Sequence, residues 1–360
     1  MMGWENFPPI SSSSSLGKYL SSHPKNATNM WHRATIKSRK QLSPTVTGLT
    51  LKIHETSSPP SATPTNSSFT FLPGQWVDFQ PLPTSTSWKP KDSNKTIGGY
   101  SITSIPKSLP YIDLAIQSSR HPVAEWVTCH AKVNDLVNLR VGGSFTYATG
   151  EKSDASVKAT TNDDNVLSNE TTTKQRLLFV AGGVGINPLF SMIQQWHVDQ
   201  RQNDRSPQPR AVLLYSARQE EDLLFVSELD EMVGELNDHF RVVLTTTAPA
   251  TDYPAGIAAL PKNDSVGNPK DSILRNIEYK RGRVNQDMIK DAVRWINMMD
   301  NAVLNDERNQ EEDDDVIADL VYICGPPGMP EDMQRLLFPS QNDRIRFVQS
   351  TDDVHFEKWW

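Results

Sequence analysis

The feature that constrains the fold most is an apolar run that leads directly into a glycine-rich turn. Residues 179–188 read FVAGGVGINP, with three glycines and then a proline suited to the first turn of a helix. Glycines let a backbone approach a pyrophosphate closely, and a helix N-terminus offers unpaired N–H groups and a positive dipole end. The segment therefore predicts a strand, turn and helix that hold a dinucleotide, although such a turn can also be purely structural.

A second segment repeats this design. Residues 321–329 read VYICGPPGM, an apolar run that delivers Cys324 to a glycine-rich turn. Because parallel strands of α/β folds bind ligands outside their carboxyl ends, we expect both turns to line one cleft. Cys324 is then a candidate contact to a nicotinamide, and its alternative is a small buried hydrophobe.

A third strand end lies between these two turns. Residues 213–218 read LLYSAR, and acids follow at 220–222. Ser216 and Arg218 could hold a 2′-phosphate. One of the acids could instead accept hydrogen bonds from the ribose hydroxyls, or the acids could simply begin the next helix. The sequence leaves NAD and NADP both open.

Two blocks of sequence with different hydrophobic patterns indicate two domains. Residues 31–149 contain short alternating runs separated by Pro and Gly, typical of an antiparallel β-barrel. Residues 175–360 alternate continuous apolar strands with helical patterns, one of them at 220–236, typical of a parallel sheet with crossover helices. The predicted fold class is thus a two-domain β plus α/β protein, with a polar linker at 150–174.

Composition indicates polar additions around these cores. Apolar residues make up only 37% of the 360 residues, and there are 25 prolines. Insertions are predicted near 57–68, 83–95, 248–270 and 300–315. Residues 1–30 are predicted to be a disordered tail or a targeting segment, because the N-terminus is basic, serine-rich and poor in acids; a mitochondrial address is expected, with a cytoplasmic location as the alternative.

The net charge and the number of cysteines exclude several classes of function and of site. A net charge of -7 provides no overall field for nucleic acid. Cys129 and Cys324 are too few for a disulfide framework, a zinc tetrathiolate or an iron–sulfur cluster, so no metal site is predicted and a one-electron partner must be a separate molecule. The longest apolar stretch, 177–186, is far below the ~20 residues that cross a membrane.

Two further segments carry side chains suited to a flat ligand. Residues 97–104 read IGGYSITS, so an aromatic ring at Tyr100 and hydroxyls at Ser101 and Thr103 could stack on and hydrogen-bond a heterocycle. A strand with Tyr and Ser is also common in a core. Residues 355–360 read HFEKWW, and three aromatics at a terminus predict docking, onto either a planar cofactor or the sheet edge.

Taken in order, these segments resemble the ferredoxin-NADP reductase superfamily, which has an FAD-binding FR-type barrel. Within it, the chain is most similar to the oxidoreductase NAD-binding domain-containing protein family. That similarity rests on GGYSI at 98–102, GVGINP at 183–188 and FEKWW at 356–360. The resemblance covers about residues 31–360 apart from the insertions.

The resemblance implies a hydride transfer from NAD(P)H to a bound flavin, FAD, and then electron transfer to an external acceptor. It implies catalytic roles for Ser101, Cys324 and Glu357. It also implies that Tyr100 stacks on the flavin, that the 182–185 turn holds the pyrophosphate, and that Arg218 lies by the adenosine ribose. The full set of implied cofactor-binding residues is Tyr100, Ser101, Thr103, Gly182, Gly183, Val184, Gly185, Asn187, Pro188, Ser216, Arg218, Cys324, Gly325, Pro326 and Trp360.

One departure from the superfamily pattern bears on the flavin. The usual signature is Arg-x-Tyr-Ser, in which the arginine pairs with the flavin phosphate, and Gly98 stands at its place. The second phosphate signature is not clear at 121–126, where Arg120 or His121 could compensate. The alternative function is therefore a nicotinamide-nucleotide-binding sensor or assembly protein that has lost flavin.

Overall fold

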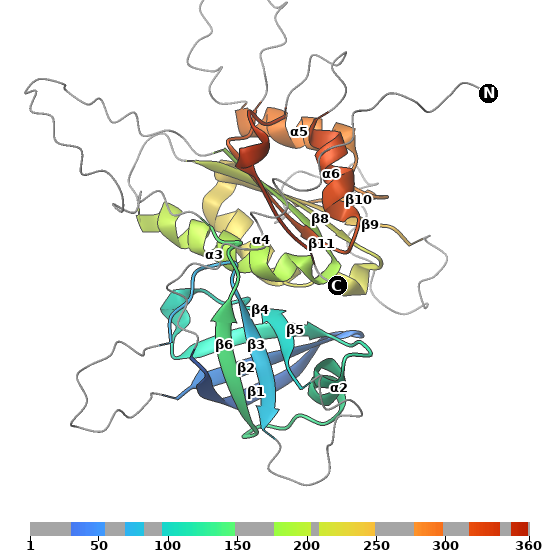
Figure 1. The fold of residues 1–360 in the computed structure, drawn as a ribbon. Coiled ribbons are helices and arrows are strands. Elements are labelled where there is room, and N and C mark those ends of the chain that lie inside the picture. Colours follow the sequence, from blue (N-terminus) through green and yellow to red (C-terminus); the bar gives the residue numbers. More distant parts are fainter. Residues whose placement is uncertain are drawn as a thin grey trace, which may run out of the picture.

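The computed structural model contains two six-stranded sheets, one antiparallel and one parallel (Figure 1). The predicted two-domain β plus α/β fold is confirmed. The structure describes residues 30–54, 69–82, 96–147, 176–202, 209–248, 277–297, 317–338 and 347–358. The predicted tail and linker lie outside the described residues, as do nearly all of the predicted insertions.

The first sheet closes into a barrel. Its strands follow the order β4-β3-β6-β1-β2-β5, and every pair is antiparallel. A bridge between Ile102 and Leu114 joins the end of β4 to β5, so the two edge strands meet. The strands are β1 (His32–Ser43), β2 (Val46–Ile53), β3 (Trp76–Leu82), β4 (Gly98–Ser101), β5 (Tyr111–Gln117) and β6 (Leu136–Gly142).

Buried and partly exposed side chains alternate along these strands, and the buried ones fill the barrel. In β3, for example, Val77 and Phe79 are fully buried while their neighbours are partly exposed. The short helix α2 (Pro122–Cys129) packs Trp126 against Phe79, with ring centroids 6.2 Å apart. The barrel therefore has a core of its own, separate from those of the second domain.

The second sheet is parallel throughout, in the order β10-β9-β8-β7-β11-β12. The order in which the chain adds strands reverses at β7. The strands β8, β9 and β10 extend the sheet on one side of β7, and β11 and β12 extend it on the other. Such a reversal is where open α/β sheets bind ligands. The strands are β7 (Arg176–Gly182), β8 (Arg210–Ala217), β9 (Phe240–Thr246), β10 (Ile277–Arg281), β11 (Leu320–Gly325) and β12 (Val354–Lys358).

Helices cover both faces of this sheet (Figure 1). The helices α3 (Ile186–Gln202) and α4 (Val226–Leu236) pack on the face that carries Leu177 and Phe179, whereas α5 (Gln286–Asn297) and α6 (Met329–Leu337) pack on the other. The expected helix at 220–236 is shorter than predicted. A 3₁₀ turn occupies 220–222, and Phe225 takes a positive φ of 61° that interrupts the helix before α4 begins. None of the helices in the described ranges is long and apolar enough to cross a bilayer.

One face of α3 joins the two domains. Asn187, Ser191 and Gln194 donate side-chain hydrogen bonds to the barrel carbonyls of Ala115, Ser104 and Thr103, at 2.7, 2.6 and 2.6 Å. Spacings of four and three residues place these three side chains on one side of the helix. Apolar residues of the barrel, including Phe145 and Tyr147, continue into the core beneath α3.

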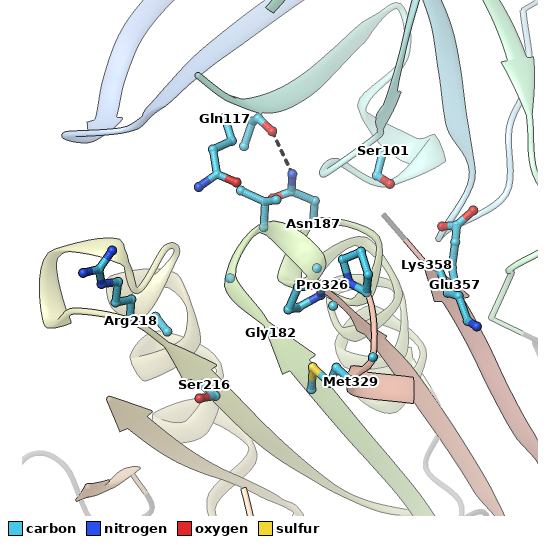
Figure 2. Close-up of a pocket in the computed structure, with 18 of the residues that line it drawn as sticks. Ser101, Gln117, Gly182, Asn187, Ser216, Arg218, Pro326, Met329, Glu357 and Lys358 are labelled. Carbon is cyan, nitrogen blue, oxygen red and sulfur yellow. Dashed lines mark hydrogen bonds between the residues drawn. The ribbon is translucent and has the colours of Figure 1, made fainter. Parts of the chain in front are cut away.

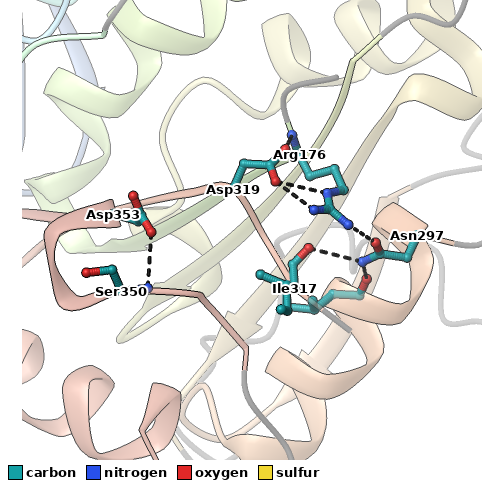
Figure 3. A network of polar contacts seen from close by, with 7 residues as sticks. Arg176, Asn297, Ile317, Asp319, Ser350 and Asp353 are labelled. Carbon is teal, nitrogen blue, oxygen red and sulfur yellow. Dashed lines mark hydrogen bonds and ion pairs between the residues drawn. The ribbon is translucent and has the colours of Figure 1, made fainter. Parts of the chain in front are cut away.

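A polar network fixes the amino ends of the central strands, on the sheet edge opposite the glycine turns (Figure 3). Asp319, just before β11, accepts from the backbone N–H of Arg176 at 2.7 Å and from the Arg176 guanidinium at 2.7 and 3.1 Å. Arg176 also donates to Asn297, and Asn297 donates to the carbonyl of Ile317. This network holds β7, β11 and α5 together at the end of the sheet that carries no glycine turn.

Candidate functional site

A cleft of about 1280 Å³ lies between the barrel and the carboxyl ends of the parallel strands. Its walls come from β3, β4 and β5 on one side and from the turns after β7, β8 and β11 on the other. Figure 2 shows Ser101 and Glu357 on one side of this cleft, Ser216 and Arg218 on the opposite side, and Gly182 between them. The cleft exceeds the usual size of a single small-molecule site, so it has room for more than one ring system.

The two glycine turns meet at the floor of this cleft. Gly183 has a φ of 53°, and a Cβ added at Gly182 would lie 2.5 Å from the Met329 Sδ. A Cβ at Gly185 would strike the carbonyl oxygen of Cys324. Glycine is therefore required for the turns after β7 and β11 to approach each other, and together they bring the N-termini of α3 and α6 to the cleft.

Three neighbouring strand ends form the far side of the cleft. Ser216 lies at the end of β8 and Arg218 directly after it, Thr247 follows β9, and Arg283 follows β10. Both arginine side chains are exposed, and within the described ranges neither forms an ion pair. Two other cations of the cleft differ in this respect, because Arg335 pairs with Asp332 and Lys358 pairs with Glu331.

The barrel wall of the cleft consists of two aromatic rings seated on glycines. A Cβ at Gly98 would lie 2.6 Å from the Tyr100 hydroxyl, and a Cβ at Gly142 would lie 2.7 Å from the Trp76 ring. Tyr100 also packs edge-on against Phe79, with ring centroids 5.9 Å apart. Burial raises the pKa of the Tyr100 phenol, so this side chain stays neutral. The wall is suited to stacking against a flat apolar ring.

Two buried polar groups face this part of the cleft. Ser101 is 1% exposed, and its Oγ has no hydrogen-bond partner among the described residues. Glu357, on β12, pairs in register with Cys324, and its Oε2 is likewise buried without a partner in the described ranges. Burial raises the pKa of the Glu357 carboxyl to about 8, so it is mostly protonated at pH 7. Unpartnered buried polar atoms in a cleft are groups that a ligand can satisfy.

Most of the predicted site residues line this one cleft. They are Tyr100, Ser101, Gly182, Gly183, Val184, Gly185, Asn187, Ser216, Arg218, Gly325, Pro326 and Glu357.

Four predicted residues are placed elsewhere or lie outside the described residues. Cys324 is fully buried within the core cluster beneath α3, and the cleft begins at the next residue, Gly325. Thr103 is 3% exposed and presents its carbonyl to Gln194 rather than its side chain to the cleft. Pro188 is buried in the first turn of α3. Trp360 lies outside the described residues.

Several lining residues were not predicted as site residues from the sequence. Trp76 begins β3 within the sequence GQW at 74–76, which also resembles the ferredoxin-NADP reductase superfamily and could have identified it. Gln117, Thr247 and Arg283 carry no local signal, because their place depends on how the strands are ordered in space. His121 was named only as a possible substitute for the missing arginine, and it precedes the proline with which α2 begins.

The comparisons with known proteins agree with this geometry. Residues 179–258 match the family model of the oxidoreductase NAD-binding domain. The predicted resemblance is confirmed. Oxidoreductase NAD-binding domain-containing protein 1 of Bos taurus is 27% identical over 301 residues, which cover 81% of this chain and 72% of the relative.

Solved structures share the two-domain architecture. The flavohem-like FAD/NAD-binding domain of nitric oxide dioxygenase from Vibrio cholerae O1 biovar El Tor aligns with a TM-score of 0.52 at 14% identity, over 91% of this chain and 98% of that one. The cytochrome b5 reductase domain of Ulva prolifera nitrate reductase aligns with a TM-score of 0.53 at 14% identity, over 91% and 97%. The chain thus has the fold of the NAD(P)H-dependent, ferredoxin reductase-like oxidoreductases.

Proposed function

We propose that this protein is an oxidoreductase that passes a hydride from NAD(P)H to a flavin ring in the cleft between its domains, with electrons leaving to an external acceptor. The observation that carries the proposal is the buried, unpartnered Ser101 hydroxyl, on a residue that lines the same cleft as the two glycine turns. A structural two-domain protein has no need for this combination.

The nicotinamide dinucleotide half of the proposal is supported by the sheet edge. The turn at Gly182–Gly185 would hold the pyrophosphate, because its backbone can approach closely and α3 begins there. Arg218 and Ser216 would lie by the adenosine ribose. Gly325 and Pro326, on the other side of Gly182, would lie against the nicotinamide.

The residues of the barrel wall fit a flavin ring. Trp76 and Tyr100 offer aromatic surface, and the Ser101 Oγ can hydrogen-bond a ring nitrogen. A bound flavin would supply the acceptor for a hydride, which protein side chains cannot provide. The task of the chain is to align the two rings and to exclude water.

Glu357 would place a protonated carboxyl group at the nicotinamide end of the cleft. Because the pKa of its carboxyl is raised to about 8, the protonated form prevails at neutral pH and can donate a hydrogen bond or a proton. Its place on β12, opposite the end of β11, is consistent with closing the nicotinamide side of the site.

The test is anaerobic mixing of the purified protein with flavin and NADPH or NADH, monitored by loss of the visible absorbance of the oxidised flavin. Ser101→Ala is expected to slow the reduction rate about 100-fold while the Kd of the dinucleotide is unchanged. Ser227→Ala, at an exposed position on α4, is the matched control. Absence of flavin reduction by the wild-type protein with either nucleotide would contradict the proposal.

A second candidate is a nicotinamide-nucleotide-binding sensor or assembly protein without flavin. Gly98 at the place of the phosphate-binding arginine favours it. Calorimetry separates the two candidates, since the sensor binds NADPH or NADH and shows no heat with any flavin.

A further inference from the structure

The places where the superfamily pattern would hold a flavin phosphate are occupied here by the chain's own side chains. The first is Gly98. The Tyr100 hydroxyl lies so close over Gly98 that a Cβ there would be 2.6 Å from the oxygen and 2.8 Å from a ring carbon. Tyr100 therefore fills the space through which an arginine side chain would leave residue 98, and its packing on Phe79 holds it there.

The second place is the N-terminus of α2. Pro122 opens the helix and has no N–H, and the next N–H, that of Val123, donates to His121 Nδ1 at 3.3 Å. The N–H of Glu125 is already donated to the His121 carbonyl. Only the Ala124 amide of this first turn has no acceptor among the described residues, so the turn offers a phosphate one donor rather than a cradle.

Arg120, which could have compensated, is exposed and does not line the cleft, although its neighbours Ser119 and His121 do. The barrel residues that line the cleft include no Lys or Arg, and their one formal charge is that of Asp78, which is paired with Arg140 at 2.9 Å. What the wall does offer is two aromatic rings and the unpartnered Ser101 hydroxyl. The two rings recognise a flat ring system, and none of the three groups carries the positive charge with which an arginine binds a phosphate.

We infer that flavin is an exchangeable second substrate of this protein, held by its ring and not by its phosphates. This rests on the proposed function, since it concerns the same cleft. A hydride with its electron pair leaves the nicotinamide ring, which becomes NAD(P)⁺. The oxidised flavin takes up that hydride and one solvent proton, and the two-electron-reduced flavin diffuses to the external acceptor.

The experiment compares riboflavin, FMN and FAD as substrates of the full-length protein, with NADPH or NADH in excess under anaerobic conditions. The three have the same ring and carry no phosphate, one phosphate and a diphosphate. We expect their kcat/KM values to agree within about threefold, and the protein to lose flavin during gel filtration. A charge-assisted phosphate contact would instead favour FMN or FAD by about 10- to 100-fold.

The outcomes separate the inference from the proposed function. A preference for FAD of about tenfold or more, or FAD retained through gel filtration, overturns the inference and leaves the flavin-linked oxidoreductase intact. Failure of all three flavins to be reduced overturns both.

A gain-of-contact variant gives an independent check. Gly98→Arg introduces the missing cation and is expected to raise kcat/KM for FMN and FAD about tenfold relative to riboflavin. Gly98→Ala displaces Tyr100 to a similar extent without a charge, so it should change all three flavins alike. If Gly98→Arg does not fold, as judged by circular dichroism, the wild-type comparison of the three flavins decides by itself.

Discussion

Asn187, at the start of α3, donates from its Nδ2 to the carbonyl oxygen of Ala115 at 2.7 Å, and both residues line the cleft. This bond crosses from the nucleotide-binding domain to the barrel where both residues are buried. Removal of the donor leaves a buried carbonyl unpaired. We expect Asn187→Ala to lower the free energy of unfolding by about 1–3 kcal/mol, measured by urea denaturation.

The control for that measurement lies on the same helix. Gln195 bonds Asp199 one turn further along α3 and not the barrel, so Gln195→Ala should change the free energy of unfolding by at most about 0.5 kcal/mol. Equal stability of Asn187→Ala and the wild type would show that this hydrogen bond does not hold the domains together.

Glu357 predicts a pH dependence of stability. Its pKa rises from 4.5 to about 8 in the folded chain, so the folded state keeps a proton that the unfolded state loses. The resulting cost is absent below about pH 4.5, grows as the pH rises to about 8 and is then constant. Glu357→Gln removes the charge and should gain stability relative to the wild type across this window. Thermal unfolding at several pH values measures it, and a difference that does not vary with pH would contradict the assignment.

Arg218 and Arg283 predict how the protein distinguishes NADPH from NADH. Two guanidinium groups without ion-pair partners in the described ranges stand after β8 and β10, on either side of β9, where the adenosine half is expected. We expect Arg283→Ala and Arg218→Ala each to raise the Kd of NADPH about tenfold and that of NADH less, because only NADPH carries a 2′-phosphate. Arg294→Ala, on an exposed position of α5, is the control. Equal losses for both coenzymes would indicate a contact to the shared pyrophosphate.

Gly185 predicts a steric effect. A methyl group there meets the carbonyl oxygen of Cys324, so Gly185→Ala should separate the two turns, lower the melting temperature and weaken dinucleotide binding together. Gly234→Ala is the matched control, because nothing lies within 4 Å of its Cβ and it stands within α4. There the same change should stabilise the protein by about 0.5–1 kcal/mol.

Local sequence accounts for the parts of the site that depend on backbone shape. The turns at Gly182–Gly185 and Gly325 were predictable because glycines at a strand end indicate a tight turn or a close backbone approach. The position of Cys324 was not, since strands buried on both faces are apolar throughout, and their sequence does not say which face a side chain takes. The start of α4 was also mispredicted, because acids suit a helix N-terminus and the positive φ of Phe225 leaves no composition signal.

Residues brought in by strand order were beyond prediction as well. Arg283 follows a five-residue strand whose parallel pairing with β9 is a long-range contact. His121 differs, since its contact is local: its ring accepts a hydrogen bond from the Val123 backbone N–H at the start of α2.

The three side chains of α3 that donate hydrogen bonds to the barrel have a consequence for the proposed function. Asn187, Ser191 and Gln194 lie in the first three turns of α3, which rises about 1.5 Å per residue and begins directly after the turn Gly182–Gly185. In the proposed function, the spacing between the nicotinamide and the flavin would therefore be set by the geometry of this helix. A flexible loop could change the distance between the two rings. The helix cannot shift relative to the barrel without breaking all three hydrogen bonds.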